Sequence, residues 1–239
     1  LAVDAQRIRR PLAEVHERTQ GDGIICGTGL VAGQPTAAMA VDYMVLAGTQ
    51  GFNHHRKMDR LIELAGRNNL PMVLFAEGGG GRPNDYDVEQ MMAAWLNVGS
   101  FRHFAAYKGR KIGIVAGFCF AGNAALFGVC NVRIATQNSW IGMGGPAMIE
   151  GGGLGVVKPT KIGPSDTQVK NGVIDLLTQD EASAVAATKI LLALSQKAEV
   201  AMPEVPSEVL RSIVPVDRTR AYDMRKAVLA VVDPDSFLE

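Results

Sequence analysis

The sequence lacks the features that mark nucleic-acid-binding, membrane-spanning and secreted proteins. Its 24 lysine and arginine residues are balanced by 24 aspartate and glutamate residues, so no basic excess predicts a nucleic acid or a membrane as partner. No apolar run reaches the ~18 residues of a membrane-spanning helix, and the N-terminal residues do not form a signal-peptide core. The three cysteines, Cys26, Cys119 and Cys130, are an odd number set in apolar segments. They favour reduced thiols in a cytoplasmic protein, with a mitochondrial location as the alternative, over a disulfide framework.

Glycine, by contrast, is abundant, with 27 glycines among 239 residues. The glycines cluster at residues 78–81, 142–145 and 151–155, which predicts tight backbone approaches in place of a disordered tail. A hydrophobic content of 47% is ordinary for a globular α/β protein, and the chain is long enough for one large domain.

Apolar runs alternate with helical patterns along most of the chain. They predict strands over residues 24–31, 36–46, 71–76, 112–116, 132–135 and 173–177, and helices over 12–18, 85–107, 122–130, 161–172, 182–195 and 221–232, with a further helix that ends near residue 66. The first two strands form a hairpin, residues 178–181 form a capping box, and the prolines of 201–215 indicate a linker. This order predicts repeated β–α winding with right-handed crossovers, and so an α/β fold. The glycines of the hairpin do not have the spacing of a dinucleotide-binding motif.

The stretch from Ile112 to Gly155 carries the strongest indication of a site. A buried strand is followed by Gly117, then by Ala121-Gly122-Asn123, and then by a helical pattern. A helix that starts at small residues leaves backbone N–H groups without partners and presents the positive end of its dipole. The turn therefore predicts an oxyanion hole, for an enolate or thioester oxygen, and the glycine-dense residues 142–155 are expected close by. The alternative interpretation is a tight joint between a strand and a helix.

Two other segments are candidates for contact with an anion. Four glycines, Gly78–Gly81, follow the buried strand 71–76, where ligands meet open α/β sheets, and Arg82 after them is a candidate anion contact. Arg56 and Lys57 lie near the start of the helix that ends at residue 66, where they serve either a bound phosphate or a solvated face. The adjacent histidines 54 and 55 lack the spacing of a helical metal site, and we expect no metal there.

From about residue 21 to the end, the sequence resembles the N-terminal half of the carboxyltransferase of biotin-dependent acyl-CoA carboxylases, which act on acetyl-, propionyl- or longer-chain acyl-CoA. The resemblance is carried by six motifs in the same order: GTGLVAG, VLAGTQGFNHHRKMDRLIELA, LPMVLFAEGGGGR, GIVAGFCFAGNAA, IGMGGPAMIEGGGLG and the tail IVPVDRTRAYDMRKAVLAVVDPDSFLE. It implies a crotonase-like (ClpP-like) fold, a β-β-α superhelix. It also implies transfer of a carboxyl group from N1-carboxybiotin to the α-carbon of an acyl-CoA, with biotin on a partner domain and the coenzyme A ester as substrate.

By this resemblance, the amides of Ala121 and Gly122 hold the thioester oxygen as it becomes an enolate. The family usually has two glycines at these positions, and alanine is expected to leave its N–H available. Further residues are expected on the substrate side of the site: Gly78, Gly79, Gly80, Gly81, Arg82, Gly48, Thr49, Gly51, Arg56, Lys57, Gly117, Phe118, Gly144 and Gly145.

Two other functions stay open. An enoyl-CoA hydratase or isomerase of the same fold places a catalytic glutamate just after the glycine turn, where this chain has Ala125, and Glu150 is no convincing replacement. A ClpP-type protease would need a serine at the helix start, and none is there. The other open function is a non-catalytic acyl-CoA-binding or assembly module.

The resemblance also predicts how the chain is divided and with what it assembles. We expect an arm over residues 1–20, an acyl-CoA-binding domain over 21–200, and over 201–239 a linker and the start of a C-terminal, biotin-side domain. The chain thus resembles one half of a longer polypeptide, inactive alone. The expected partners are the C-terminal half and the biotin carboxyl carrier and biotin carboxylase domains or subunits. Further copies of the chain are also expected, six in all, as the resemblance to the family implies.

Overall fold

The structure, a computed structural model, describes residues 10–82, 99–194, 207–233 and 236–238. The chain divides into two compact units, residues 1–193 and 194–239, and each is considered by itself. Residues 85–98 of the predicted helix 85–107, residues 1–9 of the arm and residues 201–206 of the linker lie outside the described part.

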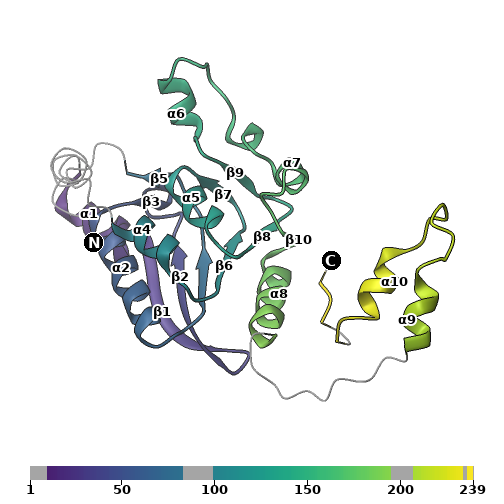
Figure 1. Ribbon diagram of the computed structural model, residues 1–239. Helices are drawn as coiled ribbons and strands as arrows, with labels where there is room; N and C mark the ends of the chain where they lie inside the picture. The colour runs from purple at the N-terminus through teal and green to yellow at the C-terminus, as the bar shows by residue number, and fades with distance from the viewer. Residues whose placement is uncertain (1–9, 83–98, 195–206, 234–235, 239) are drawn as a thin grey trace. The chain divides into compact units, whose positions relative to one another are not determined.

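A six-stranded sheet forms the centre of the first unit (Figure 1). Its strands, in spatial order, are β1 (Ile24–Val31), β2 (Gln34–Val41), β4 (Met72–Phe75), β6 (Lys111–Val115), β8 (Val132–Thr136) and β10 (Leu176–Thr178). Only β1 and β2 are antiparallel, and every other neighbouring pair is parallel. The hairpin and the β–α winding predicted from the sequence are therefore confirmed. The second strand ends five residues earlier than predicted, since the Asp42 carboxylate accepts the Met44 amide and starts a turn.

Helices follow most of the strands. In the first unit they are α1 (Leu12–Arg18), α2 (Phe52–Arg67), α4 (Gly99–Ala106), α5 (Gly122–Gly128), α6 (Pro146–Gly151), α7 (Ser165–Lys170) and α8 (Glu181–Ala193), with short 3₁₀ turns η2 (Gln20–Gly23), η3 (Leu46–Gly48) and η5 (Pro159–Lys161). Helix α6, which was not predicted, lies inside the glycine-dense segment 142–155 and begins at Pro146, since proline is favoured at the first position of a helix. The Asp180 carboxylate, rather than Thr178, caps α8, since it accepts the Ser183 amide at 2.8 Å.

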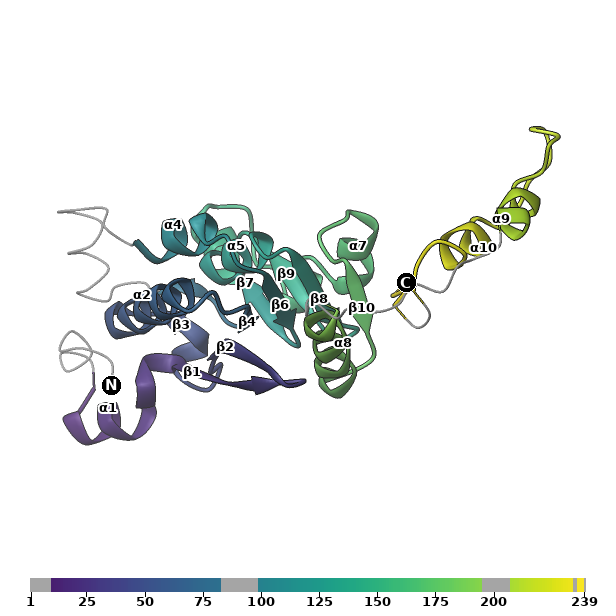
Figure 2. The same cartoon turned by 60° about the horizontal axis from the view of Figure 1, so that its bottom comes forward.

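The hydrophobic core lies on both faces of the large sheet, because successive strand residues point to opposite sides. On one face, the buried side chains of α2, α4 and α5 pack on the sheet, among them Met58, Phe104 and Phe127. On the other face, Ala184 and Leu192 of α8 pack on apolar residues of β4, β6 and β8. Figures 1 and 2 show α2, α4 and α5 on one side of the sheet and α8 on the other.

Two short parallel sheets of two strands each accompany the large sheet. They pair β3 (Thr49–Gln50) with β5 (Gly80–Gly81), and β7 (Phe118–Phe120) with β9 (Trp140–Gly142). A bridge between Gly78 and Cys119 joins them. This arrangement brings the ends of three strand–loop segments to the start of α5.

The second unit contains α9 (Ser207–Ile213) and α10 (Met224–Leu229). The helix predicted over 221–232 is thus confirmed in a shorter form, and part of the predicted linker is helical. None of the helices in the described ranges is long and apolar enough to cross a lipid bilayer.

Candidate active site at the start of helix α5

The turn between β7 and α5 has an unusual backbone. Ala121, the residue before the helix, has φ 49° and ψ −119°, in the positive-φ region that favours glycine. The turn reverses the chain sharply, so that α5 starts directly at the end of β7. Backbone strain at a non-glycine residue is concentrated at functional sites, and the structure around it has to hold it in place.

The amide of Gly122, the first residue of α5, is the donor that this turn presents. Within the described residues it has no hydrogen-bond partner, and Gly122 is partly exposed. The first amides of a helix have no intrahelical acceptor, and they carry the positive end of its dipole. A carbonyl oxygen that gains negative charge would therefore be stabilised here.

The structure corrects the role expected for Ala121. Its amide donates a hydrogen bond to the carbonyl oxygen of Gly142 at 3.0 Å, so it is not available to a substrate oxygen. Substitution of glycine by alanine is not the reason, because the bond involves only backbone atoms. The pairing of β7 with β9 brings Gly142 opposite Phe120 and delivers its carbonyl to the next amide. Of the two amides predicted as catalytic, only that of Gly122 is free to act.

The four-glycine loop lies directly against this amide. A Cβ atom on Gly80 would lie 2.5 Å from the Gly122 nitrogen and 2.7 Å from the Ala121 Cβ, with φ at Gly80 of +82°. Only glycine lets the backbone of this buried residue pack so closely against the start of α5. The exposed glycines on either side, Gly79 and Gly81, keep this edge open.

The segment of residues 48–51 lies in contact with the four-glycine segment 78–81. A Cβ on Gly78 would lie 2.5 Å from the Gly48 Cα, and the Gly79 amide donates to the Ala47 carbonyl oxygen at 3.0 Å. The Gly78 amide in turn donates to the Phe118 carbonyl oxygen at 2.6 Å. The predicted grouping of residues 48–51, 78–81 and 121–122 is thus present in the structure.

Arg82, predicted to contact an anion, has a structural place instead. Its side chain is 3% exposed, its Nη1 lies 2.7 Å from Oδ1 of the fully buried Asp22, and its Nη2 donates to the Thr49 carbonyl oxygen at 2.9 Å. Asp22 also accepts the amide of His54 at 3.0 Å, in the first turn of α2. The short distances from a Cβ at Gly51 to Asp22 and Arg82 show that only glycine fits beside this ion pair.

The two cations of α2 also have partners that explain them without a ligand. Lys57 Nζ donates to the carbonyl oxygens of Gly21 (2.8 Å) and Ile24. The Arg56 guanidinium lies over the Phe52 ring, 5.5 Å from its centre, and remains exposed. Lys57 is thus held by backbone carbonyl oxygens, which neither of the two interpretations left open had given, whereas Arg56 is exposed, which is compatible with both.

Aromatic rings surround the other side of β7. Phe118 stacks on Trp140 with a centroid distance of 4.8 Å and on Phe120 at 5.8 Å. Gly145 lies against the Phe120 ring, where a Cβ would come within 3.4 Å, whereas a Cβ on Gly144 would have its nearest neighbour at 3.9 Å, in Met148. Gly142 and Gly145 thus lie near the turn, as predicted for the segment 142–155.

Three polar residues of the site were not predicted. Gln50 and Asn123 are buried at 1% and 0% exposure and hydrogen-bonded to each other beside the turn. Glu77 lies in the loop after β4, and a Cβ on Gly117 would lie 3.6 Å from its carboxylate. Burial raises the pKa of Glu77, and the charge of Glu181 raises it further. The sequence indicated these three residues only in that each is a polar side chain within an otherwise apolar or glycine-rich run.

Other titratable groups near the turn are unsuited to nucleophilic or metal chemistry. Burial raises the pKa of the Cys119 thiol well above its usual value, so the thiol stays protonated. Burial lowers the pKa of His54 to about 3, with a further contribution from His55, so His54 is neutral at physiological pH. In the described ranges, no cluster of three histidine, cysteine or acidic side chains is arranged to hold a metal ion.

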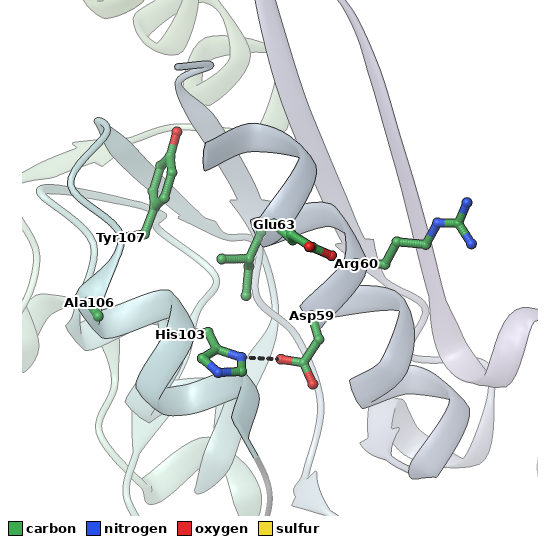
Figure 3. A pocket seen from close by; sticks show the side chains of 7 residues that line it. Asp59, Arg60, Glu63, His103, Ala106 and Tyr107 are labelled. Atoms are coloured by element: carbon green, nitrogen blue, oxygen red, sulfur yellow. Dashed lines mark hydrogen bonds and ion pairs between the residues drawn. The ribbon is translucent and has the colours of Figure 1, made fainter. Parts of the chain in front are cut away.

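A separate cavity of about 590 Å³ lies between α2 and α4 (Figure 3). Among its lining residues, Asp59 and His103 form a 3.0 Å contact between the two helices, with Arg60 and Glu63 nearby. Tyr107 closes it at one end and donates to the Leu70 carbonyl oxygen. The cavity is lined by helices and not by the glycine segments, so it is not part of the site at α5.

Comparisons with known proteins identify the family to which the chain is similar. The sequence model of the carboxyl transferase domain matches residues 5–239. The biotin-dependent long chain acyl-coenzyme A carboxylase beta4 subunit of Mycobacterium tuberculosis is 28% identical over 232 residues, which cover 92% of this chain and 44% of that protein.

Two solved structures have the same fold. A single-chain, multi-domain long-chain acyl-CoA carboxylase aligns with a TM-score of 0.84 and 46% identity, over 98% of this chain and 24% of that one. The transcarboxylase 12S hexamer, with hydrolysed methylmalonyl-coenzyme A bound, aligns with a TM-score of 0.75 and 25% identity, over 89% of this chain and 44% of that one. The chain spans less than half of the length of the curated relatives it matches.

Proposed function

The chain belongs to the carboxyl transferase domain family, and on that premise we propose that it forms the acyl-CoA side of a biotin-dependent acyl-CoA carboxylase. Its fold is the crotonase-like α/β fold that the resemblance implied, shared with the carboxyltransferases to which it aligns. The observation that carries the proposal is the Gly122 amide at the start of α5, which has no hydrogen-bond partner among the described residues and lies against the glycine segment 78–81.

The chemistry asked of this chain is the stabilisation of charge on an oxygen atom. The thioester oxygen of an acyl-CoA accepts a hydrogen bond from the Gly122 amide, with the helix dipole of α5 behind it. A second donor comes from the Gly80–Gly81 backbone, in place of the occupied Ala121 amide. As the α-proton leaves, the oxygen becomes an enolate, and the α-carbon is then able to attack a carboxyl carbon. Carboxybiotin, when bound, would supply that carboxyl group by cleavage of its bond to N1, and the ureido nitrogen freed by that cleavage would accept the α-proton.

The coenzyme A ester lies along the glycine segments in this proposal. Residues 48–51 and 78–81 bring backbone atoms close to the ligand, and their contacts with each other hold the two segments in register. The exposed Arg56 is the remaining side-chain candidate for a phosphate of coenzyme A. Lys57 and Arg82 stabilise the backbone near these segments through their hydrogen bonds to the carbonyl oxygens of Gly21 and Thr49.

The acyl group and the partners are proposed from the relatives. Since the carboxylase that is 46% identical over 98% of this chain acts on long-chain acyl-CoA, we propose a long-chain acyl-CoA as substrate. The partners are a biotin carboxyl carrier, a biotin carboxylase and the C-terminal carboxyltransferase half. Further copies of the chain would assemble as in the transcarboxylase 12S hexamer. The compartment we propose is the cytoplasm.

Calorimetric titration of residues 1–239 with acetyl-CoA, propionyl-CoA and octanoyl-CoA, a soluble medium-chain ester that stands in for the long-chain substrate, tests the acyl-CoA site. We expect binding of all three, tightest for octanoyl-CoA, and no carboxylation by the chain alone, because it spans less than half of its relatives. Gly80→Ala places a methyl group 2.5 Å from the Gly122 nitrogen, so the glycine segment has to move relative to this amide, and we expect binding to be abolished. Gly172→Ala is the matched control, since Gly172 also has a positive φ of 71° but nothing within 4 Å of its Cβ position.

Each outcome of the titration has a defined meaning. Binding that survives Gly80→Ala, or is lost equally in Gly172→Ala, would argue against a ligand oxygen at Gly122. A folded chain that binds no coenzyme A ester would refute the proposal as a whole. Turnover by the chain alone with free carboxybiotin would show that the C-terminal half is dispensable.

A further inference from the structure

Asn123, the second residue of α5, has a fully buried side chain with three hydrogen-bond partners. Its Nδ2 donates to the carbonyl oxygens of Gly48 at 3.0 Å and Glu77 at 2.6 Å. Its Oδ1 accepts from Gln50 Nε2 at 2.5 Å. These partners come from η3, from the loop after β4 and from β3. One side chain thus connects the start of α5 with both glycine segments that face Gly122, and the elements lie side by side in Figure 1.

The direction of these hydrogen bonds is fixed by the partners. Carbonyl oxygens only accept, so Asn123 has to present its nitrogen to Gly48 and Glu77, and its oxygen to Gln50. Gln50, which is 1% exposed, has to present its nitrogen to Asn123, because the Asn123 oxygen only accepts. Its own Oε1 is left with no hydrogen-bond partner in the described part of the chain. A reversed Gln50 would place two oxygens in contact, so the unpaired oxygen follows from the fixed direction of the network.

Gln50 also touches the residue that carries the proposed donor. A Cβ on Gly122 would lie 2.9 Å from Gln50 Oε1 and 3.1 Å from Cζ of Phe101. Gly122 is therefore enclosed by Gln50 and Phe101 on its Cα side, while Gly80 faces its nitrogen. Fully buried hydrogen-bonded networks favour one arrangement over its alternatives. Donors of an oxyanion hole have to lie within about 0.5 Å of their productive places.

We propose that Asn123 and Gln50 are positioning residues of the oxyanion site. They set the place of the Gly122 amide relative to the Gly80 backbone, and so the degree to which a bound thioester carbonyl is polarised. Neither residue touches the reacting atoms. The inference rests on the proposed function, since it assumes a thioester oxygen at Gly122.

The test is infrared spectroscopy of octanoyl-CoA labelled with ¹³C at the thioester carbonyl, bound to the full chain. A hydrogen-bonded, polarised carbonyl absorbs at lower frequency than the free thioester, and we expect this shift in the unchanged protein. Gln50→Met keeps the size of the side chain but removes both polar atoms. Asn123→Ala removes the whole connection. Both are expected to lose most of the shift, while affinity falls by less than about tenfold, the factor given by about 1.4 kcal/mol.

Thr188→Val is the matched control. Thr188 is 3% exposed, and its hydroxyl donates to the Ala184 carbonyl oxygen at 2.9 Å within α8, away from the turn. The Thr188→Val variant therefore loses a buried hydrogen bond and some stability, but it is expected to keep the full shift of the thioester carbonyl frequency. Gln50→Met leaves two of the Asn123 bonds intact, so the test stands if Asn123→Ala does not fold.

The inference and the proposed function fail in different ways. A full carbonyl shift in Gln50→Met would overturn the positioning role and leave the acyl-CoA site intact. The same conclusion would follow if Thr188→Val lost as much of the carbonyl shift as Gln50→Met. Octanoyl-CoA that binds the unchanged protein without any shift would overturn both, because no donor would then act on its carbonyl.

Discussion

Ala121 allows a sharp prediction, because it is an alanine where the backbone favours glycine. Its φ of 49° and ψ of −119° lie outside the regions open to most L-residues. A residue held in such a conformation costs about 1–3 kcal/mol, which the surrounding structure has to offset. Ala121→Gly removes that strain. It also removes no hydrogen bond, because the bond from Ala121 to Gly142 is between backbone atoms.

The expected gain is the strain minus the entropy that a glycine adds to the unfolded chain. Glycine costs about 0.5–1 kcal/mol relative to alanine at positions without strain. Subtracting this from about 1–3 kcal/mol of strain leaves a net increase of about 1 kcal/mol in the free energy of unfolding. For a chain of this length, about 1 kcal/mol raises the melting temperature by roughly 2–4 °C.

Urea denaturation and thermal unfolding of three variants measure the effect. Ala32→Gly, in the hairpin turn with φ 49°, is expected to stabilise the protein in the same way as Ala121→Gly. Ala186→Gly, on the exposed face of α8, is expected to destabilise it by about 1 kcal/mol, since glycine disfavours helix. A loss of stability in Ala121→Gly, equal to that in Ala186→Gly, would refute the argument that Ala121 is strained.

Further predictions concern the support of the site. Arg82→Met leaves Asp22 buried without its charge partner, and we expect the free energy of unfolding to fall by about 3–5 kcal/mol in urea denaturation. Adding Asp22→Asn to Arg82→Met should recover part of that loss, and a double variant no more stable than Arg82→Met would contradict it. His54 has a pKa of about 3 when folded and about 6.5 when unfolded, so the unfolded state binds a proton first as the pH falls. Stability should therefore decrease below about pH 6.5, by up to about 1.4 kcal/mol per pH unit from this residue, and His54→Gln should show a flatter dependence.

The elements of the fold were largely predictable from residue patterns, and the limits of the prediction have physical causes. Buried apolar runs and the Ala32-Gly33 turn were enough to place the large sheet, because each follows from local composition. The short strands β3, β5, β7 and β9 were not predicted. They are two or three residues long, so only their pairing partners define them.

The candidate site was predictable in its backbone and not in its side chains. The glycine segments and the helix start were found because glycine is rare without a geometrical reason. The buried ion pair of Arg82 could not be predicted, since a charge in the sequence carries no information about a buried partner such as Asp22, 60 residues away along the chain. The occupied amide of Ala121 depended on the register of β7 with β9, which no local pattern specifies.

The contact between Gly80 and the Gly122 amide has a consequence for mutagenesis. A site whose working parts are backbone atoms cannot be dissected by truncating side chains, because the atoms that matter stay in place after every change to alanine elsewhere. The informative experiment is the reverse, in which side-chain atoms are added one position at a time along residues 78–81 and 121–122. In such a scan, Gly79 and Gly81 report on the substrate, because a Cβ there meets no described atom closer than 3.4 Å, whereas Gly78 and Gly80 report on the packing of the glycine segments against their neighbours.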